Sequence, residues 1–497
     1  MQLNRDALLA RWRADRLPFL AALGFGLLAH GFLLTNKIPV DDDLPNFFNK
    51  GATYVSGRYG LELLRLVMPD VSMPWIYGWM SLALLALAVC VMLRLFRIKS
   101  PALRLLLAGV FVTFPAETGT LCYMFTAVPY ALALLLTVTG VALFAENRRG
   151  RWLLSPLLIA FSCSIYQGYF AFAASFCVIL LIRALAVEGK DAKPVLLDGF
   201  RLLGMLLLAL ALYGLAILTA AKLLHLPLLG EAVNSRQSLP LRAAVAYSAW
   251  LKTLLRGYFA YVPSRAARLC HVLLLLTAGA ALILRVRRGR DVKALGLLAL
   301  CLILFPLSCY CLYLLADNSY IHALALYPFA SLYVLCAVLL DGAESPAPLR
   351  RTGSLALALV LAGSVYFANA FTLRAKLQYE NTYALYAAVV AEVFETEGFD
   401  ENARVALIGQ PAAARTRFDS AFDFDAFTLP GVNITDRRQA ENVIRLYLGF
   451  DLPFVSEEEQ AALAESPEFA EMPVWPYAGS VQKIGDVVAV KLGEVAP

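Results

Sequence analysis

The chain alternates long apolar stretches with short polar ones over roughly its first three quarters. Windows of about 18–22 almost wholly apolar residues predict membrane-spanning helices, because a helix of that length crosses the hydrocarbon core of a bilayer. We expect about eleven spans, and residues 152–186 hold either two short spans or one span and a re-entrant helix. The predicted spans are residues 17–35, 75–96, 101–116, 126–144, 152–166, 168–186, 200–222, 268–285, 294–315, 322–341 and 352–372.

Composition agrees with this pattern. Hydrophobic residues make up 60% of the 497 residues and charged residues 16%, and the mean hydropathy is +0.67. These values exclude an ordinary soluble protein and indicate an α-helical polytopic membrane protein. The nine cysteines lie mostly inside apolar runs without metal-ligand spacing, so we expect them to be packing residues. Basic residues precede the first apolar run, as in a secretory signal, but no small-residue cleavage site follows Leu34, so we expect a retained first span.

Basic residues set the predicted orientation. With the N-terminus inside, every predicted inner loop is basic, whereas most outer connections carry few charges, as the positive-inside rule requires. An odd number of spans then places the C-terminal segment outside. The bases of the inner loops are Arg94, Arg97, Lys99, Arg104, Arg148, Arg149, Arg151, Arg183, Lys190, Lys193, Arg201, Arg285, Arg287, Arg288, Arg290, Lys293, Arg350 and Arg351.

The segment 373–497 differs from the membrane domain 1–372. It has about twice as many acidic as basic residues, and its pattern predicts a small α/β domain outside the membrane. The predicted helices are Leu377–Glu397 and Arg437–Leu448, and the predicted strands are Arg404–Ile408 and Asp486–Leu492. It contains no phosphate loop, metal-spaced histidines or nucleophile elbow, so we expect a capping or acceptor-contacting domain.

The first outer loop, residues 36–74, carries Asp41, Asp42 and Asp43 directly after the first span. Carboxylates at the mouth of a span lose hydration without gaining anything from lipid, so the cluster indicates a functional site, although one or more of the three could simply be solvated. Apolar and aromatic residues from Leu44 to Val67 recur at helical spacing and predict an amphipathic helix on the membrane surface. Within it, Arg58 either pairs with Glu62 or binds phosphate.

The second outer loop, residues 223–267, is basic and so departs from the positive-inside rule. Lys252 and Arg256 alternate with tyrosines and a tryptophan between Arg242 and Tyr261, which predicts a basic interfacial helix. Guanidinium groups pair bidentately with phosphate oxygens, so such a helix suits a lipid phosphate. The alternative is general binding of anionic headgroups.

Together these residues fit transfer of a sugar from a lipid phosphate. A carboxylate would accept the acceptor proton, and cations would balance charge on the departing phosphate. Glu117 is either a second acid near the site or a helix-start residue, and Tyr166 and Gln167 either line a donor groove or join two helices. No nucleotide fold or nucleic-acid partner is expected. The four scattered histidines predict no metal site, whereas a divalent cation on the aspartates stays open.

Short motifs add a family resemblance. "LLTNKIPVDDDL" after the first span, "YVSGRYGLELL" in the same loop, "SIYQGYF" at Ser164–Phe170 and the terminal "VWPYAGSVQKIGDVVAVKL" resemble the type II Gtr glucosyltransferases, serotype-converting enzymes of the GT-C class. In that family an acid of the first outer loop is the catalytic base, and Asp42 or Asp43 matches its place. The family's two acids follow a polar residue, whereas three run together here, which leaves the base unassigned among them.

The resemblance implies a GT-C-like fold in a bacterial inner membrane, with a cytoplasmic N-terminus and a periplasmic C-terminal domain. It implies a polyprenyl-phosphate-glucose donor and a lipid-linked polysaccharide acceptor such as O-antigen, with a companion polyprenyl-phosphate glucosyltransferase and a flippase as partners. The rival interpretations are a transporter or flippase of lipid-linked glycans and a non-catalytic scaffold. The lack of an internal repeat disfavours a transporter, and the acid cluster disfavours a scaffold.

Overall fold

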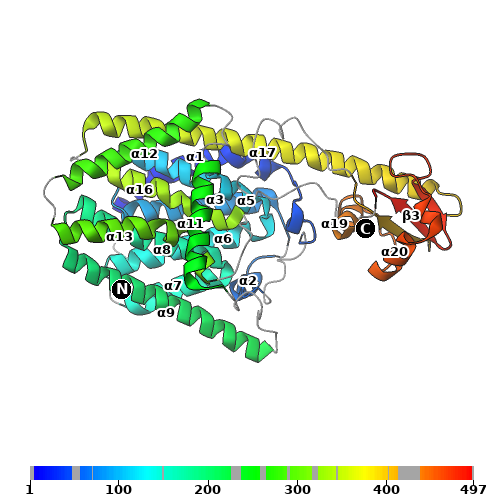
Figure 1. Cartoon of the computed structure of the whole chain (residues 1–497), viewed down its shortest axis with the longest axis horizontal. Coiled ribbons are helices and arrows are strands. Elements are labelled where there is room, and N and C mark those ends of the chain that lie inside the picture. The colour runs from blue at the N-terminus through cyan, green and yellow to red at the C-terminus, as the bar shows by residue number, and fades with distance from the viewer. Residues whose placement is uncertain are drawn as a thin grey trace. The chain divides into compact units, whose positions relative to one another are not determined.

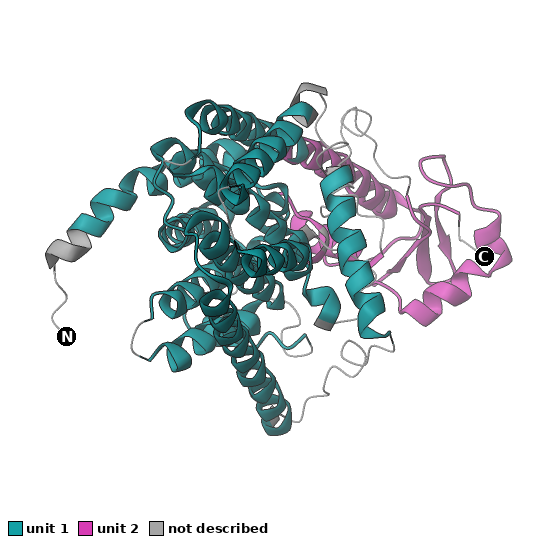
Figure 2. Cartoon of the chain, turned by 60° about the vertical axis from the view of Figure 1, so that its left-hand side comes forward, with its two compact units in different colours: residues 1–37, 49–371, 421–429 teal, residues 38–48, 372–420, 430–497 magenta. Residues whose placement is uncertain are grey.

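The computed structural model describes residues 5–46, 56–69, 71–147, 150–224, 237–257, 265–287, 291–315, 323–342, 345–400, 402–411 and 437–494, except the side chains at 5–9, 41, 224, 256–257, 265–268, 315 and 323. It is mostly helical and divides into two compact units (Figure 2). Unit 1 comprises residues 1–37, 49–371 and 421–429, and unit 2 comprises residues 38–48, 372–420 and 430–497. The first outer loop is therefore shared between the units.

Unit 1 is built from apolar helices (Figure 1). Among the described residues, eight are long and apolar enough to cross a membrane, or nine if the pair α4 and α5, bent by 44°, is one broken span. The eight are found in α1 (Arg5–Thr35), α3 (Pro74–Leu95), α6 (Met124–Ala145), η2 to η3 (Gln167–Val187), α9 (Ala192–Leu224), α12 (Arg265–Val286), α13 (Val292–Cys309) and α17 (Ala347–Glu395). The multi-pass character is thus supported, and the count of eleven stays a prediction.

Shorter elements complete unit 1. The predicted spans at 152–166 and 322–341 coincide with helices too short to meet that length criterion, Arg151–Ile165 and Leu324–Leu340. The additional elements are α2 (Tyr59–Arg65), α4 (Pro101–Thr113), α5 (Pro115–Cys122), α7 (Arg151–Ile165), η2 (Gln167–Tyr169), α8 (Phe170–Ile182), η3 (Arg183–Val187), α11 (Leu239–Lys252), η4 (Thr253–Gly257), α14 (Leu312–Leu315), α15 (Ala323–Leu326), η5 (Tyr327–Ala330) and α16 (Ser331–Leu340). All nine cysteines are free thiols, and all but Cys270 are buried.

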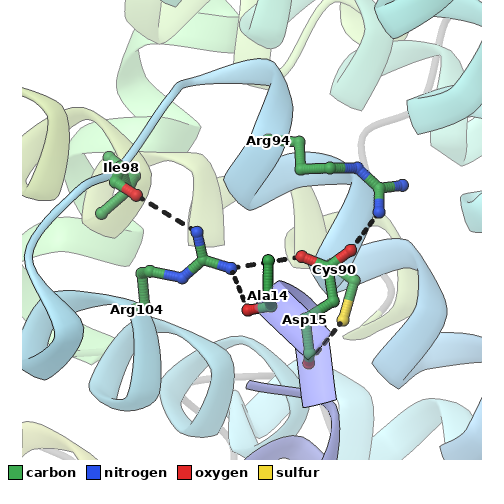
Figure 3. Close-up of polar contacts among 6 residues, drawn as sticks. All are labelled: Ala14, Asp15, Cys90, Arg94, Ile98 and Arg104. Atoms are coloured by element: carbon green, nitrogen blue, oxygen red, sulfur yellow. Dashed lines mark hydrogen bonds and ion pairs between the residues drawn. The ribbon is translucent and has the colours of Figure 1, made fainter. Parts of the chain in front are cut away.

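Asp15 joins helix α1 to helices α3 and α4 through ion pairs (Figure 3). Its buried carboxylate forms ion pairs with Arg94 of α3 and, at 3.2 Å, with Arg104 of α4. Arg104 also donates to the carbonyl of Ala14 at 3.1 Å. Two cations on one buried carboxylate satisfy its oxygens, which makes this aspartate a structural residue of unit 1.

The helix predicted in the second outer loop is present as far as the structure describes that loop. Helix α11 ends at Lys252 and continues as η4 to Gly257, while Tyr258 and Tyr261 lie outside the described residues. It runs across the direction of α12 and α13 (Figure 1). Its inner face is packed rather than lipid-exposed, since Trp250 lies 5.5 Å from the ring of Phe329.

The continuous helix predicted from Leu44 to Val67 is wrong. The described residues contain the short turn η1 (Asp41–Asp43) and, separately, α2 from Tyr59 to Arg65. Gly57 adopts a left-handed φ of 69°, which interrupts a right-handed helix. A side chain at that position would also approach the hydroxyl of Tyr213 to 3.0 Å. Close docking of the loop therefore overrides the local periodicity.

Unit 2 contains a small mixed sheet. Its strand order is β1-β3-β2, with β1 (Arg404–Ile408) parallel and β2 (Val481–Ile484) antiparallel to β3 (Val487–Lys491). The two predicted strands and the predicted helix from Arg437 are thereby confirmed. The helical elements are the C-terminal part of α17 from Thr372, η1, α19 (Arg437–Asn442), η7 (Val443–Tyr447), α20 (Glu457–Ala464) and α21 (Pro467–Ala470).

Candidate active site

Arg58 lies in a group of polar and aromatic side chains of unit 1, which we call the Arg58 cluster (Arg58, Tyr130, Tyr166, Gln167 and Tyr213). Its Nη1 donates a hydrogen bond of 3.2 Å to the Tyr130 hydroxyl, and its Cζ lies 5.4 Å from the centre of the Tyr166 ring. The two rings stack with centroids 4.6 Å apart. A guanidinium over an aromatic ring is stabilised by the cation–π interaction, and its planar fork of N–H donors is suited to phosphate oxygens.

Gln167 anchors the first outer loop to this cluster. Its Nε2 donates to the carbonyl of Ser56 at 2.6 Å and to the hydroxyl of Tyr213 at 2.8 Å. Tyr213 in turn donates to the carbonyl of Gly57 at 3.1 Å. Both amide hydrogens of Gln167 are therefore used to position Ser56 and Gly57, next to Arg58. This favours the interpretation of Gln167 as a joining residue over one that contacts the donor.

Glu117 is the second acidic candidate in unit 1. It is the third residue of α5, so it is a helix-start residue, and its side chain is only 1% exposed. Its Oε2 has no hydrogen-bond partner within the part of the chain that the structure describes. It interacts electrostatically with the buried Tyr169 and Tyr327. A buried carboxyl with an unsatisfied oxygen is costly to maintain, which points to a role beyond packing.

Tyr169 connects Glu117 with the Arg58 cluster. Its ring lies 5.4 Å from the ring of Tyr166 and 6.2 Å from that of Tyr130, edge-on in both cases. The charge of Glu117 acts on this same Tyr169 side chain. The structure thus brings together three of the predicted residues, Arg58, Tyr166 and Gln167, and Glu117 interacts electrostatically with the tyrosine beside them.

The three aspartates belong to unit 2. They form the turn η1, in which the backbone N–H of Asp43 donates to the carbonyl of Val40 at 2.6 Å. The side chain of Asp43 is fully buried, that of Asp42 is exposed, and that of Asp41 lies outside the described residues. Leu44 follows in the hydrophobic core of unit 2.

Asp43 has a tyrosine as its electrostatic neighbour. Burial, followed by the negative charge of Asp43, raises the pKa of the Tyr447 hydroxyl above its ordinary value. The Tyr447 ring packs edge-on against Tyr379 at 5.9 Å. The aspartates therefore differ in environment: Asp43 lies inside the unit, and Asp42 presents a carboxylate at its surface.

The basic helix gives one described candidate. Lys252 is exposed at the end of α11, whereas the side chain of Arg256 lies outside the described residues. Elsewhere on α11, Arg242 donates to the carbonyls of Leu314 and Gln237, at 2.9 and 3.1 Å. Arg242 is thus engaged in joining this helix to α14.

A metal site cannot be built from the described side chains, which contain no group of three or more His, Cys, Asp or Glu residues arranged to hold an ion. The side chain of Asp41 lies outside the described residues. A divalent cation on the aspartates therefore stays a prediction.

Sequence reasoning missed two tyrosines of the Arg58 cluster, Tyr130 and Tyr213, and the neighbouring Tyr169. Tyr130, Tyr169 and Tyr213 stand in or beside long apolar runs, where an aromatic ring is indistinguishable by periodicity from any other apolar residue. Their hydroxyls were the available signal, because a buried phenol normally finds a hydrogen-bond partner. Tyr130 and Tyr213 do so with the first outer loop.

Comparison with known proteins identifies the family. Residues 31–340, more than half of the chain, match the family model described as Glucosyl transferase GtrII. No significant match was found among curated proteins or among solved structures. The matched region contains the aspartate turn, the Arg58 cluster and Glu117. The chain belongs to the GtrII glucosyltransferase family and is a multi-pass membrane glycosyltransferase.

Proposed function

We propose that the protein transfers glucose from a polyprenyl-phosphate donor to a lipid-linked surface polysaccharide such as O-antigen, on the periplasmic face of a bacterial inner membrane. The observation that carries this proposal is the family match over residues 31–340. It also disfavours the transporter interpretation, because a flippase leaves its lipid chemically intact.

The reaction makes two demands on the chain. A hydroxyl oxygen of the acceptor attacks C1 of glucose as a carboxylate takes its proton, and the bond from C1 to the phosphate oxygen breaks, releasing polyprenyl phosphate. The base must be ionised and accessible, and a cation must stabilise the departing phosphate.

Arg58 is the proposed phosphate ligand. Support comes from its place in the membrane unit, where Tyr130 and Tyr166 hold the guanidinium and Gln167 fixes the backbone beside it. A guanidinium offers N–H donors in a planar fork that matches two phosphate oxygens, so this side chain suits a bidentate phosphate contact. Lys252 and Arg256 are proposed as further ligands of the same donor phosphate. Their support is their charge and their spacing in the sequence.

Four carboxylates are candidates for the base: Asp41, Asp42, Asp43 and Glu117. Exposure favours Asp42 over the fully buried Asp43 as the group that an acceptor hydroxyl can reach. Glu117 is the candidate in the same unit as Arg58, with an unsatisfied oxygen among the described residues. Asp41 is the remaining member of the aspartate turn.

The proposal is tested with purified full-length protein in liposomes. Polyprenyl-phosphate-glucose labelled in the sugar is added with lipid-linked polysaccharide, and both lipids are analysed after separation. We expect label in the polysaccharide and free polyprenyl phosphate in equal amounts. A donor that crosses the bilayer but stays chemically intact would contradict the proposal in favour of a transporter.

A further inference from the structure

A pocket of about 360 Å³ lies in unit 1 at the ends of several helices. The family match assigns it no role, and the proposed reaction does not involve its residues. It is formed where α3, α6 and η3 end and where α7 and α9 begin. Its volume falls within the range of small-ligand sites. The charged residues that line it are six bases and three acids: Arg94, Arg97, Arg151, Arg183, Lys190, Arg201, Glu146, Glu188 and Asp198.

The positive charge of this basic pocket is only partly neutralised. The carboxylate of Glu188 forms ion pairs with Arg183 at 2.7 Å, Lys190 at 2.8 Å and Arg97 at 3.6 Å. Three cations that converge on one carboxylate leave an excess of positive charge, which an added anion would balance. Burial alone would raise the pKa of Glu188, but the hydrogen bond from Lys190 and the charges of Arg183 and Arg97 lower it.

Not every base of the basic pocket is available to a ligand. Arg94 is bound to Asp15 (Figure 3), and Arg151 lies over the Phe144 ring at 4.9 Å. Arg97, Lys190 and Arg201 are the accessible ones, with side chains 70%, 51% and 47% exposed. Each of them also pairs with a carboxylate, Arg97 and Lys190 with Glu188 and Arg201 with Asp198 at 2.9 Å, so an anion would approach from outside and share these cations.

The basic pocket is distinct from the Arg58 cluster. Helices α7 and α9 pack against each other, and each contributes to both places. Arg151 and Tyr166 are fifteen residues apart, as are Asp198 and Tyr213, so the two places are separated by about 22 Å along the helices. That distance approaches the thickness of the hydrocarbon core, about 30 Å.

The surroundings indicate a lipid rather than a soluble anion. Leu181 and Leu202 line the pocket beside its charges, as an acyl chain below a headgroup would require. Trp152, 44% exposed, packs edge-on against Phe144 at 4.8 Å and covers Gly204. Tryptophan is enriched at the level of lipid headgroups, which places the pocket at the membrane surface.

We propose that the basic pocket binds the phosphate headgroup of an anionic phospholipid from the leaflet opposite the Arg58 cluster. On the predicted orientation this is the inner leaflet, where basic pockets between helix ends bind anionic headgroups. The site does not depend on the proposed sugar-transfer reaction, so the two can fail separately.

The test measures thermal unfolding of full-length protein in neutral detergent as phosphatidylglycerol, phosphatidylcholine or inorganic phosphate is added. We expect phosphatidylglycerol to raise the melting temperature saturably and phosphatidylcholine to have no such effect. In Lys190→Gln/Arg201→Gln the concentration for half the shift should rise roughly 10- to 100-fold. The matched control is Arg287→Gln/Arg351→Gln, two exposed bases outside the pocket, which should respond like the wild type.

Each outcome decides the proposal. An unchanged phosphatidylglycerol response in Lys190→Gln/Arg201→Gln overturns it, as does an equal loss in the control. Saturation by inorganic phosphate at the same concentrations, lost in the same variant, would overturn the lipid source in favour of a soluble phosphate. If the double variant does not fold, Arg201→Gln alone and native mass spectrometry of bound phosphatidylglycerol answer the same question.

Discussion

Unit 1 carries cations at both ends of α7, and the two groups are built differently. At one end a single guanidinium, Arg58, lies against stacked rings of Tyr130 and Tyr166. At the other end six bases line a pocket and several are half-exposed. Rings fix one cation in one orientation, whereas exposed side chains provide charge without fixed geometry. The proposed donor site and the proposed lipid site therefore differ in how firmly their cations are oriented rather than in how much charge they carry.

The largest effect is expected for the catalytic base. It would show whether proton transfer takes place in unit 1, which holds Arg58. An isosteric amide removes proton-accepting ability with little change of shape, so the responsible variant among Asp41→Asn, Asp42→Asn, Asp43→Asn and Glu117→Gln should lose roughly 10²–10⁴ in transfer rate. Loss only in Glu117→Gln would confine the chemistry to the unit that holds Arg58.

The control for these variants is Asp451→Asn, a carboxylate of unit 2 that is 94% exposed and paired with Arg445. It should keep full activity. Melting temperatures of all five variants should stay near that of the wild type. Near-full transfer activity in every one of the four test variants would exclude these carboxylates as the base.

The next largest effect is expected for substitutions of Arg58. Arg58→Ala should weaken apparent donor affinity roughly 10- to 100-fold, because a charge-assisted phosphate contact contributes about 1.5–3 kcal/mol. Arg58→Lys should restore only part of it, since an ammonium keeps the charge but loses the planar fork. Donor saturation curves at fixed acceptor measure both.

Arg65→Ala is the matched control, because Arg65 is the last residue of the short helix α2, which Arg58 directly precedes, and it pairs with Glu62 at 3.1 Å. It should leave the donor curve unchanged. If Arg65→Ala and Arg58→Ala weaken donor binding equally, the Arg58 cluster has no special role in holding phosphate.

A smaller effect is expected for the basic helix. Arg256→Ala and Lys252→Ala should each weaken apparent donor affinity about tenfold, close to the lower limit for a charged hydrogen bond. An unchanged donor curve combined with a changed dependence on bulk anionic lipid would instead assign these bases to headgroup binding. They would then resemble the basic pocket rather than Arg58.

The smallest effect requires no substitution. Raising salt from about 0.1 M to about 1 M shortens the screening length from about 10 Å to about 3 Å and weakens exposed charges most. The phosphatidylglycerol-dependent melting shift should decrease severalfold, whereas donor affinity should change by less than about threefold. Equal salt dependence of the two would remove the distinction between them.

The sequence predicted regular elements better than contacts. Apolar windows located the helical segments of unit 1, because burial in lipid requires long apolar runs. A short run of β-branched and apolar residues located β1, and alternation located β3. The sequence could not predict that Gly57 adopts a left-handed conformation against Tyr213, which ends the expected helix. That contact joins residues 156 positions apart, and no local pattern encodes it.

The same reason limits prediction of the site. Arg58 was a candidate by its charge, yet the rings that hold it come from α6 and the end of α7. Charge also identified the bases near Arg97 and Lys190 as belonging to one side of the membrane, by the positive-inside rule. Their convergence on Glu188 depends on how α3, η3 and α9 pack, which only the structure provides.

The burial of the cysteines has a practical consequence. A thiol reagent must reach a thiolate to react, and eight of the nine native thiols are enclosed by the fold. With Cys270→Ser as a single replacement, the chain becomes an almost unreactive background for chemical mapping. New cysteines at Asn46 and Ser456, read with a membrane-impermeant reagent, would then report directly on which side of the bilayer each lies.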